Sequence, residues 1–360
     1  MKNTKKALLM NTQKSKVLPM LATKYDQLLS FDLNHEASYE KLVSTIESLY
    51  KEKIACVISK TKQNIELLLV PQYRVINYQD PFVRKTARTI FPDTHREPYN
   101  LFKYDRTRKT PIFYTLDHSW ALLSWLSASK AFLEKKITIL HFDDHDDLGS
   151  PFLDYSHSDF TTAKDYFTAR KYDMLNVADL FDAIAYGNIG IGSFILPFVS
   201  LCKQPNLIHV KQEAQYINKE KRVLESNSYT SEEFQFRRLF WSSSNNDLSH
   251  FSYSRLSIDQ LEPITDSDFV IIDIDCDYFC NVNRWDKKPI ESNLTIEDLQ
   301  IKLDNFSERL KEIIIYQKIL CITIALSPDF FPSKFWQHTV NQIDKIIDEI
   351  HDAPRSCLKK

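Results

Sequence analysis

Short apolar runs that alternate with helical patterns constrain the fold of this chain more than any other feature of its sequence. Four runs rich in β-branched and aromatic residues are each long enough for one strand: TPIFYTLD (110–117), ITILHF (137–142), FVIIDID (269–275) and ILCITIAL (319–326). Apolar residues at helical spacing follow the first run and flank the last, at 295–318 and 333–352. Strands separated by helices favour a mainly parallel sheet covered on both faces. The predicted fold class is therefore α/β, a three-layer α/β/α domain with a mainly parallel sheet.

The pattern also predicts how the 360 residues divide. Residues 80–110 are rich in Pro, Asp, Arg and Thr and are typical of a connector. We therefore expect an N-terminal accessory region at about 1–105 and the α/β domain at 106–360. The segment 211–266 fits no simple strand–helix unit and is predicted to be an insertion, either for substrate selection or as a solvated excursion. The chain has only four glycines, all between 149 and 192, where sharp turns or close backbone approaches are expected.

Charge and cysteine content exclude several classes of protein. A formal net charge of −2 argues against broad electrostatic binding to nucleic acid. The six cysteines show no CxxC pair and no disulfide-like rhythm, which is typical of reduced thiols in a cytoplasmic protein. No apolar stretch approaches the roughly 20 residues of a membrane span. The N-terminal residues lack the apolar core of a secretory signal, so none is predicted.

Acidic residues follow three of the four runs at the point where each strand ends. They are Asp117-His118 after the first run, DDHDD (143–147) after the second, and Asp273, Asp275 and Asp277 at the third. In parallel sheets the carboxyl ends of the strands meet at one edge, where ligands bind. Two carboxylates roughly 4 Å apart repel by about 4 kcal/mol at an effective dielectric constant of about 20, so their convergence predicts a bound cation. Solvated acidic loops are the alternative.

The type of cation follows from the ligand types. Mixed histidine and carboxylate ligands suit Mn²⁺, with Zn²⁺ or Fe²⁺ as alternatives. The alternating residues Asp143, His145 and Asp147 form an Asp-x-His-x-Asp element, and Asp273 with Asp275 forms Asp-x-Asp on one face of an extended segment. His118 lies just beyond the first strand.

These three elements, in this order, resemble the arginase and agmatinase superfamily of dinuclear manganese ureohydrolases. The strings HFDDHDDL, IGSFILP (191–197) and IDIDCDYF resemble a divergent branch that includes peptide arginases. Those enzymes convert arginine residues of ribosomally made peptides to ornithine. The resemblance covers about 110–330 and implies an arginase-like catalytic domain, a fold shared with deacetylases.

The resemblance implies two Mn²⁺ ions. One would be held by His118, Asp143, Asp147 and Asp273, and the other by Asp143, His145, Asp273 and Asp275, with Asp143 and Asp273 bridging. Two metal ions roughly 3.5–4 Å apart can hold a hydroxide against the guanidinium carbon, giving urea and ornithine as products. The expected partner is an arginine-containing precursor peptide, without nucleic acid or membrane.

Catalytic and substrate-binding residues are less specified by the sequence. The resemblance places a proton-transferring histidine in the loop after Asp-x-His-x-Asp, where His157 is the candidate. Asp146 is a second catalytic candidate. Arginases carry a guanidinium-binding glutamate after the last strand, but Ala325 stands there in ITIALSPDFFP, so Asp329 and Asp277 are the substrate-binding candidates.

Two alternatives stay open at the sequence level. A single-zinc deacetylase-like amidohydrolase would use Asp-x-His and one distant aspartate, without the second Asp-x-Asp pair. A non-catalytic, metal-stabilised peptide-binding protein is favoured by the missing glutamate. The sequence also leaves the oligomeric state open, a homo-oligomer included. His141, inside the second strand, is predicted to be a core residue or a partner of a metal ligand.

Overall fold

The computed structural model divides into two compact units. Unit 1 comprises 1–77, 147–197 and 225–240, and unit 2 comprises 78–146, 198–224 and 241–360. The residues described are 27–32, 39–49, 53–60, 64–71, 78–92, 103–105, 110–155, 160–166, 168–212, 218–230, 235–244, 250–282, 294–314 and 319–352. The predicted domain boundary near residue 105 stays a prediction.

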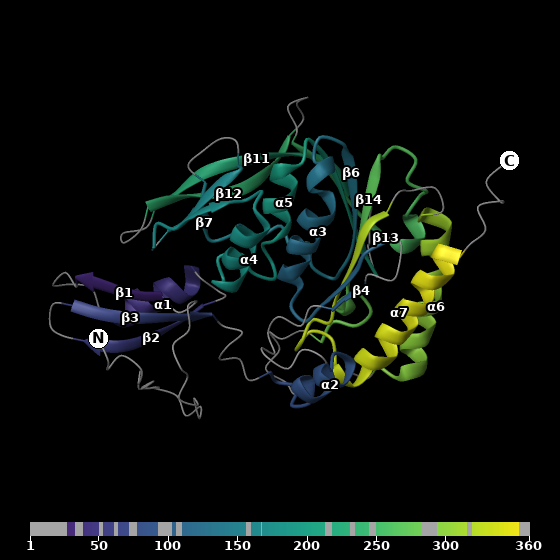
Figure 1. Ribbon diagram of the computed structural model, residues 1–360, viewed down its shortest axis with the longest axis horizontal. Helices are drawn as coiled ribbons and strands as arrows, with labels where there is room; N and C mark the ends of the chain where they lie inside the picture. Colours follow the sequence, from purple (N-terminus) through teal and green to yellow (C-terminus); the bar gives the residue numbers. More distant parts are fainter. Residues whose placement is uncertain are drawn as a thin grey trace. The chain divides into compact units, whose positions relative to one another are not determined.

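Most strands of a large mixed sheet belong to unit 2 (Figure 1). Its strands follow the order β12-β11-β13-β10-β6-β14-β15-β5-β4. Their bounds are β4 Lys103–Asp105, β5 Ile112–Thr115, β6 Lys136–Phe142, β10 Gln204–Lys211, β11 Asn218–Thr230, β12 Gln235–Ser244, β13 Phe251–Ser257, β14 Phe269–Asp275 and β15 Ile319–Ala325. The six neighbours from β13 to β5 are joined by parallel pairs, and β4 and β11 are added antiparallel. The predicted α/β class with a mainly parallel sheet is therefore confirmed.

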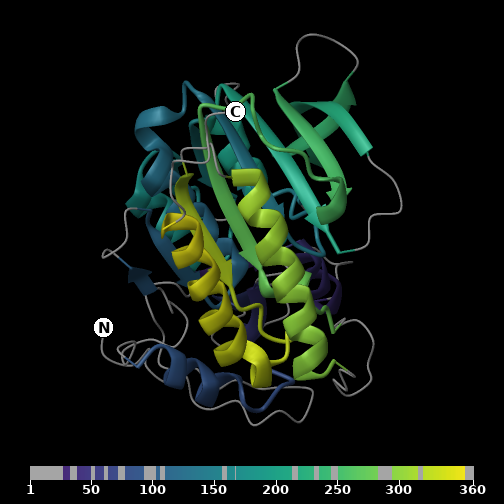
Figure 2. The ribbon, with the colours of Figure 1, turned by 90° about the vertical axis from the view of Figure 1, so that its right-hand side faces the viewer.

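Helices α6 (Ile296–Ile314) and α7 (Trp336–Asp352) lie side by side against one face of this sheet (Figure 2). They form one apolar cluster with alternate strand residues, among them Leu140 and Phe142 of β6 and Ile272 and Ile274 of β14. Helix α2 (Val83–Ile90) adds Val83 and Ala87 to the same cluster. Because side chains alternate across a strand, the residues between these point to the opposite face.

The opposite face carries polar residues near the carboxyl ends of its strands. Helix α3 (Ala121–Ser129) contacts β15 there, and Trp125 donates a hydrogen bond from Nε1 to Oγ1 of Thr323 at 3.1 Å. In the sheet register Thr323 pairs with Asp273, Asp273 with His141, and His141 with His209. Paired residues of parallel strands share a face, so one buried polar row crosses four strands.

Unit 1 contains two small antiparallel sheets. The first has the order β1-β3-β2, with β1 Gln27–Asp32, β2 Lys53–Lys60 and β3 Asn64–Pro71, and helix α1 (Tyr39–Leu49) contacts β2. The second has the order β7-β8-β9, with β7 Leu153–Asp154, β8 Thr162–Asp165 and β9 Lys171–Asp173. Helix α4 (Val177–Ala185) contacts β9, and α5 (Ile195–Leu201) begins in this unit and ends in unit 2.

Close backbone packing in unit 1 explains one of the clustered glycines. The Gly149 amide donates to the carbonyl oxygen of Gly192 at 2.8 Å, and a Cβ at Gly149 would lie 2.3 Å from that oxygen. No other residue type fits this approach without a backbone shift. The glycine thus fixes the chain just after the acidic DDHDD segment.

Two segments differ from their sequence-based interpretation. The predicted connector at 80–110 contains helix α2 and strand β4. The predicted insertion at 211–266 supplies β11, β12 and β13, and β13 pairs in parallel with β10 inside the main sheet. The apolar residues of this segment alternate too irregularly to be read as strands, and pairing across the sheet, of β13 with β10 and of β11 with β13, decides its structure. Among the described helices, none is long and apolar enough to cross a membrane.

Candidate metal centre

Histidines and aspartates from three chain segments of unit 2 converge beyond the carboxyl ends of β5, β6 and β14. His118 begins a short 3-10 helix, His118–Trp120, which follows β5. Asp143 and His145 follow β6, while Asp273 and Asp275 end β14. The strands are parallel, so all three ends reach one edge of the sheet. The structure therefore brings together these five predicted metal ligands.

His118 lies at the middle of the cluster. Its Nδ1 is 3.1 Å from Oδ2 of Asp143 and 3.0 Å from Oδ2 of Asp275, and its Nε2 is 2.9 Å from Oδ2 of Asp273. All four side chains are buried. The carboxylates that follow β6 and end β14 thus lie close enough to the His118 imidazole for all of these side chains to bind the same cation.

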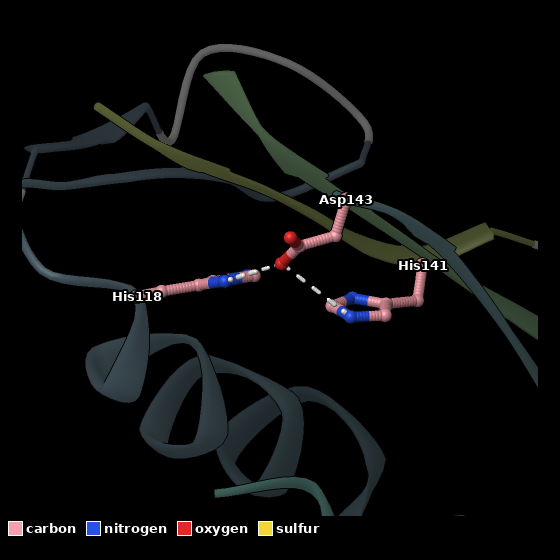
Figure 3. A group of neighbouring side chains, drawn as sticks. All are labelled: His118, His141 and Asp143. Atoms are coloured by element: carbon pink, nitrogen blue, oxygen red, sulfur yellow. Dashed lines mark ion pairs between the residues drawn. The ribbon is translucent and has the colours of Figure 1, made fainter. Parts of the chain in front are cut away.

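His141 belongs to the same cluster (Figure 3). Its Nδ1 is 2.7 Å from Oδ2 of Asp273, and its Nε2 is 3.5 Å from Oδ2 of Asp143. The ligand atoms of His118, His141 and Asp143 lie within 4.8 Å of one another, so the three can hold one ion. The sequence already indicated that His141 could join the cluster, because His141, Asp143 and His145 alternate and would share one face of an extended segment.

A second group of possible ligands consists of Asp143, His145 and Asp277. His145 Nδ1 is 3.0 Å from Oδ2 of Asp277 and 3.6 Å from Oδ1 of Asp143. The His145 side chain is 42% exposed and meets the ring of Phe330 edge-on, with ring centroids 5.4 Å apart. This group forms the solvent-facing side of the centre, and Asp277, predicted as a substrate contact, is part of it.

Among the described residues, the ion-pair partners of the buried carboxylates in the centre are imidazoles. Asp143, Asp273, Asp275 and Asp277 are all buried, and among the described residues neither a lysine nor an arginine forms an ion pair with them. An uncompensated carboxylate is costly to bury. A divalent cation would supply the missing positive charge, and the donor set of carboxylates and imidazoles suits Mn²⁺, Fe²⁺ or Zn²⁺. The residues present therefore fit a metal ion.

The pKa values of the carboxyl groups reflect both their burial and the charges around them. Burial raises the pKa of Asp277 well above its usual value, and the nearby charges of Asp143 and Asp275 add to the rise. Burial also opposes ionisation of Asp143 and Asp273, but neighbouring histidines outweigh it. They hold the pKa of Asp143 well below its usual value and lower the pKa of Asp273 to about 2. Hydrogen bonds to Asp143 and Asp277 raise the pKa of His145 to about 11.

Hydrogen bonds from surrounding residues orient the carboxylates. Thr323 donates to Oδ1 of Asp273, which leaves Oδ2 facing the histidines. Ser327 donates to Oδ2 of Asp275 at 2.5 Å, and the Asp277 amide donates to its Oδ1 at 3.0 Å. Such partners fix the direction in which a ligand atom points.

The four remaining predicted site residues differ in their surroundings. Asp147 is buried, has a left-handed backbone (φ 48°) and belongs to unit 1. Asp146 is exposed. Oδ1 of Asp329 accepts hydrogen bonds from the amides of residues 79 and 80, at 2.8 and 3.3 Å. His157 lies outside the described residues.

Sequence reasoning did not single out His209. This residue of β10 is buried, and its ring lies 5.3 Å from that of His141 between centroids. Burial and the nearby charge of His141 lower the pKa of His209 to about 3, so its ring is neutral. The sequence could have indicated His209, because it lies inside an apolar run, LIHV (207–210), in the same way as His141 lies inside ILHF.

Comparison with known proteins adds no family to this geometry. Neither protein-family models nor curated proteins give a match to the chain. The site therefore has to be interpreted from its own chemistry.

Proposed function

We propose that this centre binds two divalent ions, Mn²⁺ in preference to Zn²⁺ or Fe²⁺, and hydrolyses a guanidino group. The observation that carries the proposal is the convergence of His118, Asp143, Asp273 and Asp275 at buried contact distances without a lysine or arginine partner among the described residues. Metal ions bound there would supply a Lewis acid and activate water near neutral pH. His141 and His145 extend the donor set on either side of Asp143.

The fold class supports an arginase-like arrangement. A mainly parallel sheet contacts α6 and α7 on one face and α3 on the other, and the polar residues gather at the carboxyl ends of its strands. We propose that this is the three-layer α/β/α architecture of ureohydrolases and that 106–360 form the catalytic domain. A role for 1–105 in recognising a leader sequence is part of the same proposal.

The substrate is proposed to be an arginine residue within a ribosomally made peptide, which is converted to ornithine with release of urea. A guanidinium stays protonated near neutral pH. Beside Asp277 and His145 it would favour the ionised form of the Asp277 carboxyl, whose pKa is raised by burial and by neighbouring carboxylates. Ala325, which pairs in register with Asp275, stands where a guanidinium-binding glutamate is expected. Peptide-bound arginine fits this departure, because it needs no pockets for a free amino and a free carboxylate group.

The roles of the remaining residues are proposed accordingly. Asp277 belongs to the solvent-facing group and is the stronger candidate for contacting the guanidinium. Asp329 is already bonded to two backbone amides, which favours a role in holding its loop. Asp146 and His157 remain the candidates for proton transfer to the leaving amine. The expected location is the cytoplasm.

Two linked measurements test the proposal. Elemental analysis of the purified, Mn²⁺-supplemented chain should find bound metal, near two ions per chain. Mass spectrometry of an arginine-containing precursor peptide co-expressed with the chain should show the mass change from arginine to ornithine. Asp143→Ala should lose both properties, while Asp266→Ala should keep both, because Asp266 is 90% exposed and pairs only with Lys136 among the described residues.

The outcomes separate the alternatives. One bound ion with release of acetate from acetylated substrates would favour the deacetylase-like enzyme. Two bound ions without turnover of any arginine peptide would favour a metal-stabilised binding protein. Full metal content and activity in Asp143→Ala would contradict the proposed centre itself.

A further inference from the structure

The main chain of Asp143 is held on both sides by strand β10. Its amide donates to the carbonyl oxygen of Val210 at 3.2 Å. Its carbonyl oxygen faces Nε2 of His209 at 3.0 Å. Asp143 is the first residue after β6, where the regular strand ladder ends. The His209 side chain therefore replaces a ladder hydrogen bond at the point where the acidic loop begins.

Fixing this peptide also fixes the Asp143 carboxylate. Oδ1 accepts a hydrogen bond from the His145 amide at 2.6 Å, which ties the side chain to the loop that follows. Oδ2 is thereby directed at the histidines, 3.1 Å from Nδ1 of His118. Rotation of the 143–144 peptide would move both oxygens, because the bond at Oδ1 depends on the position of the next amides. The direction of Oδ2 thus depends on the hydrogen bond to the Asp143 carbonyl.

Both ring nitrogens of His209 have a partner. A carbonyl oxygen only accepts, so Nε2 carries the proton that is donated to Asp143. On the other side of the ring, Nδ1 lies 3.1 Å from the hydroxyl of Tyr253. Tyr253 thus contacts the ring nitrogen opposite the one that faces Asp143 and holds the ring in this orientation.

Tyr253 is itself held by the segment 211–266. The Arg222 guanidinium lies between two rings, 3.6 Å from the centroid of Tyr253 and 3.3 Å from that of Trp241. Nε of Arg222 donates to Oε1 of Glu220 at 2.9 Å. Both Arg222 and Tyr253 are buried. This stack fixes the Tyr253 ring, and with it the hydroxyl that faces His209.

We propose that His209 is a positioning residue for the metal ligand Asp143, and that Tyr253 sets its orientation. The inference rests on the proposed metal centre. It assigns a role to the predicted insertion, because Tyr253 of its strand β13 contacts His209, which in turn contacts the Asp143 carbonyl. Loss of a hydrogen-bonding partner of a metal ligand typically weakens metal binding about 10–100-fold.

Calorimetric titration of the EDTA-treated full chain with Mn²⁺ tests the proposal through affinity and not through turnover. We expect His209→Leu to weaken binding about 10–100-fold. His209→Gln should restore part of the affinity, since its amide can donate to the Asp143 carbonyl. A role in packing alone would not distinguish Gln from Leu in this way. Tyr253→Phe, which removes only the hydroxyl, should weaken binding by a smaller factor.

Tyr114→Phe is the matched control. It also removes a buried hydroxyl in unit 2, but that hydroxyl donates to Asp344 among the helices on the other face of the sheet. Thermal unfolding of each metal-free variant checks that it folds. If His209→Leu does not fold, the Mn²⁺ affinities of Tyr253→Phe and His209→Gln test the proposal instead. Wild-type affinity in the folded His209 and Tyr253 variants would overturn this proposal alone. A wild-type chain that binds no Mn²⁺ would overturn the proposed function with it.

Discussion

Replacing Asp273 with asparagine tests how the centre is stabilised when no metal is bound. The change keeps the shape of the side chain and removes its charge. In the structure Oδ2 of Asp273 lies 2.9 Å from Nε2 of His118 and 2.7 Å from Nδ1 of His141. Burial alone would raise the pKa of this carboxyl, but the two histidines lower it from 3.8 to about 2. A pKa lowered this far corresponds to about 2 kcal/mol of stability.

The sign of the pH dependence follows from the direction of the shift. A carboxyl with a lowered pKa in the folded state stabilises the fold fully above its unfolded pKa of about 4, and this contribution disappears as the pH falls to about 2. We therefore expect Asp273→Asn to lower the free energy of unfolding of the metal-free chain by about 2 kcal/mol above pH 4. The difference from wild type should shrink below about pH 4 and vanish near pH 2.

Urea unfolding of the EDTA-treated proteins, followed by tryptophan fluorescence at several pH values, measures this difference. Asp266→Asn serves as a control at an exposed site and should change the stability by less than about 0.5 kcal/mol. A difference between wild type and Asp273→Asn that stays constant down to about pH 2 would refute the reasoning. It would mean that the histidines do not stabilise the ionised carboxylate.

Two further predictions concern packing around the centre and in unit 1. Gly149→Ala should destabilise the chain by about 1–3 kcal/mol in thermal unfolding, since the new Cβ would lie 2.3 Å from the Gly192 carbonyl oxygen. Gly192→Ala has its nearest neighbouring atom at 3.9 Å and should cost less, so equal losses would contradict this explanation. Thr323→Val should cost about 1.5–3 kcal/mol in urea unfolding, because its hydroxyl donates to Asp273 and accepts from Trp125. The losses from Thr323→Val and Trp125→Phe should be non-additive in a double-mutant cycle, and simple addition would argue against a shared network.

Much of the main sheet could be predicted because its strands are buried on both faces. The four apolar runs became β5, β6, β14 and β15, and the two late helical patterns became α6 and α7. Continuous apolar runs and helical periodicity are local properties, so they can be read without knowing the partners. The strands β11 to β13 lacked such a pattern and depend on pairing across the sheet.

Candidate site residues were predictable where the motif spacing placed them at strand ends. His118, Asp143, His145, Asp273 and Asp275 were named from the sequence and lie together in unit 2. His141 was interpreted as a core or supporting residue, yet it lies as close to Asp273 as His118 does. Its contacts depend on the register of β6 against β14, which pairs His141 with Asp273. A register of this kind cannot be read from either strand alone.

The sequence by itself determined the kind of chemistry available: acids and histidines at strand ends, which are residue types that could hold a cation. Only the tertiary structure decided which of them meet, because the distances between residues more than a hundred positions apart are set by strand order and register. It also decided that Thr323, Ser327 and His209 hold the carboxylates and the backbone of Asp143 in place. These residues carry no motif of their own, and their role arises from the strand beside which each of them folds.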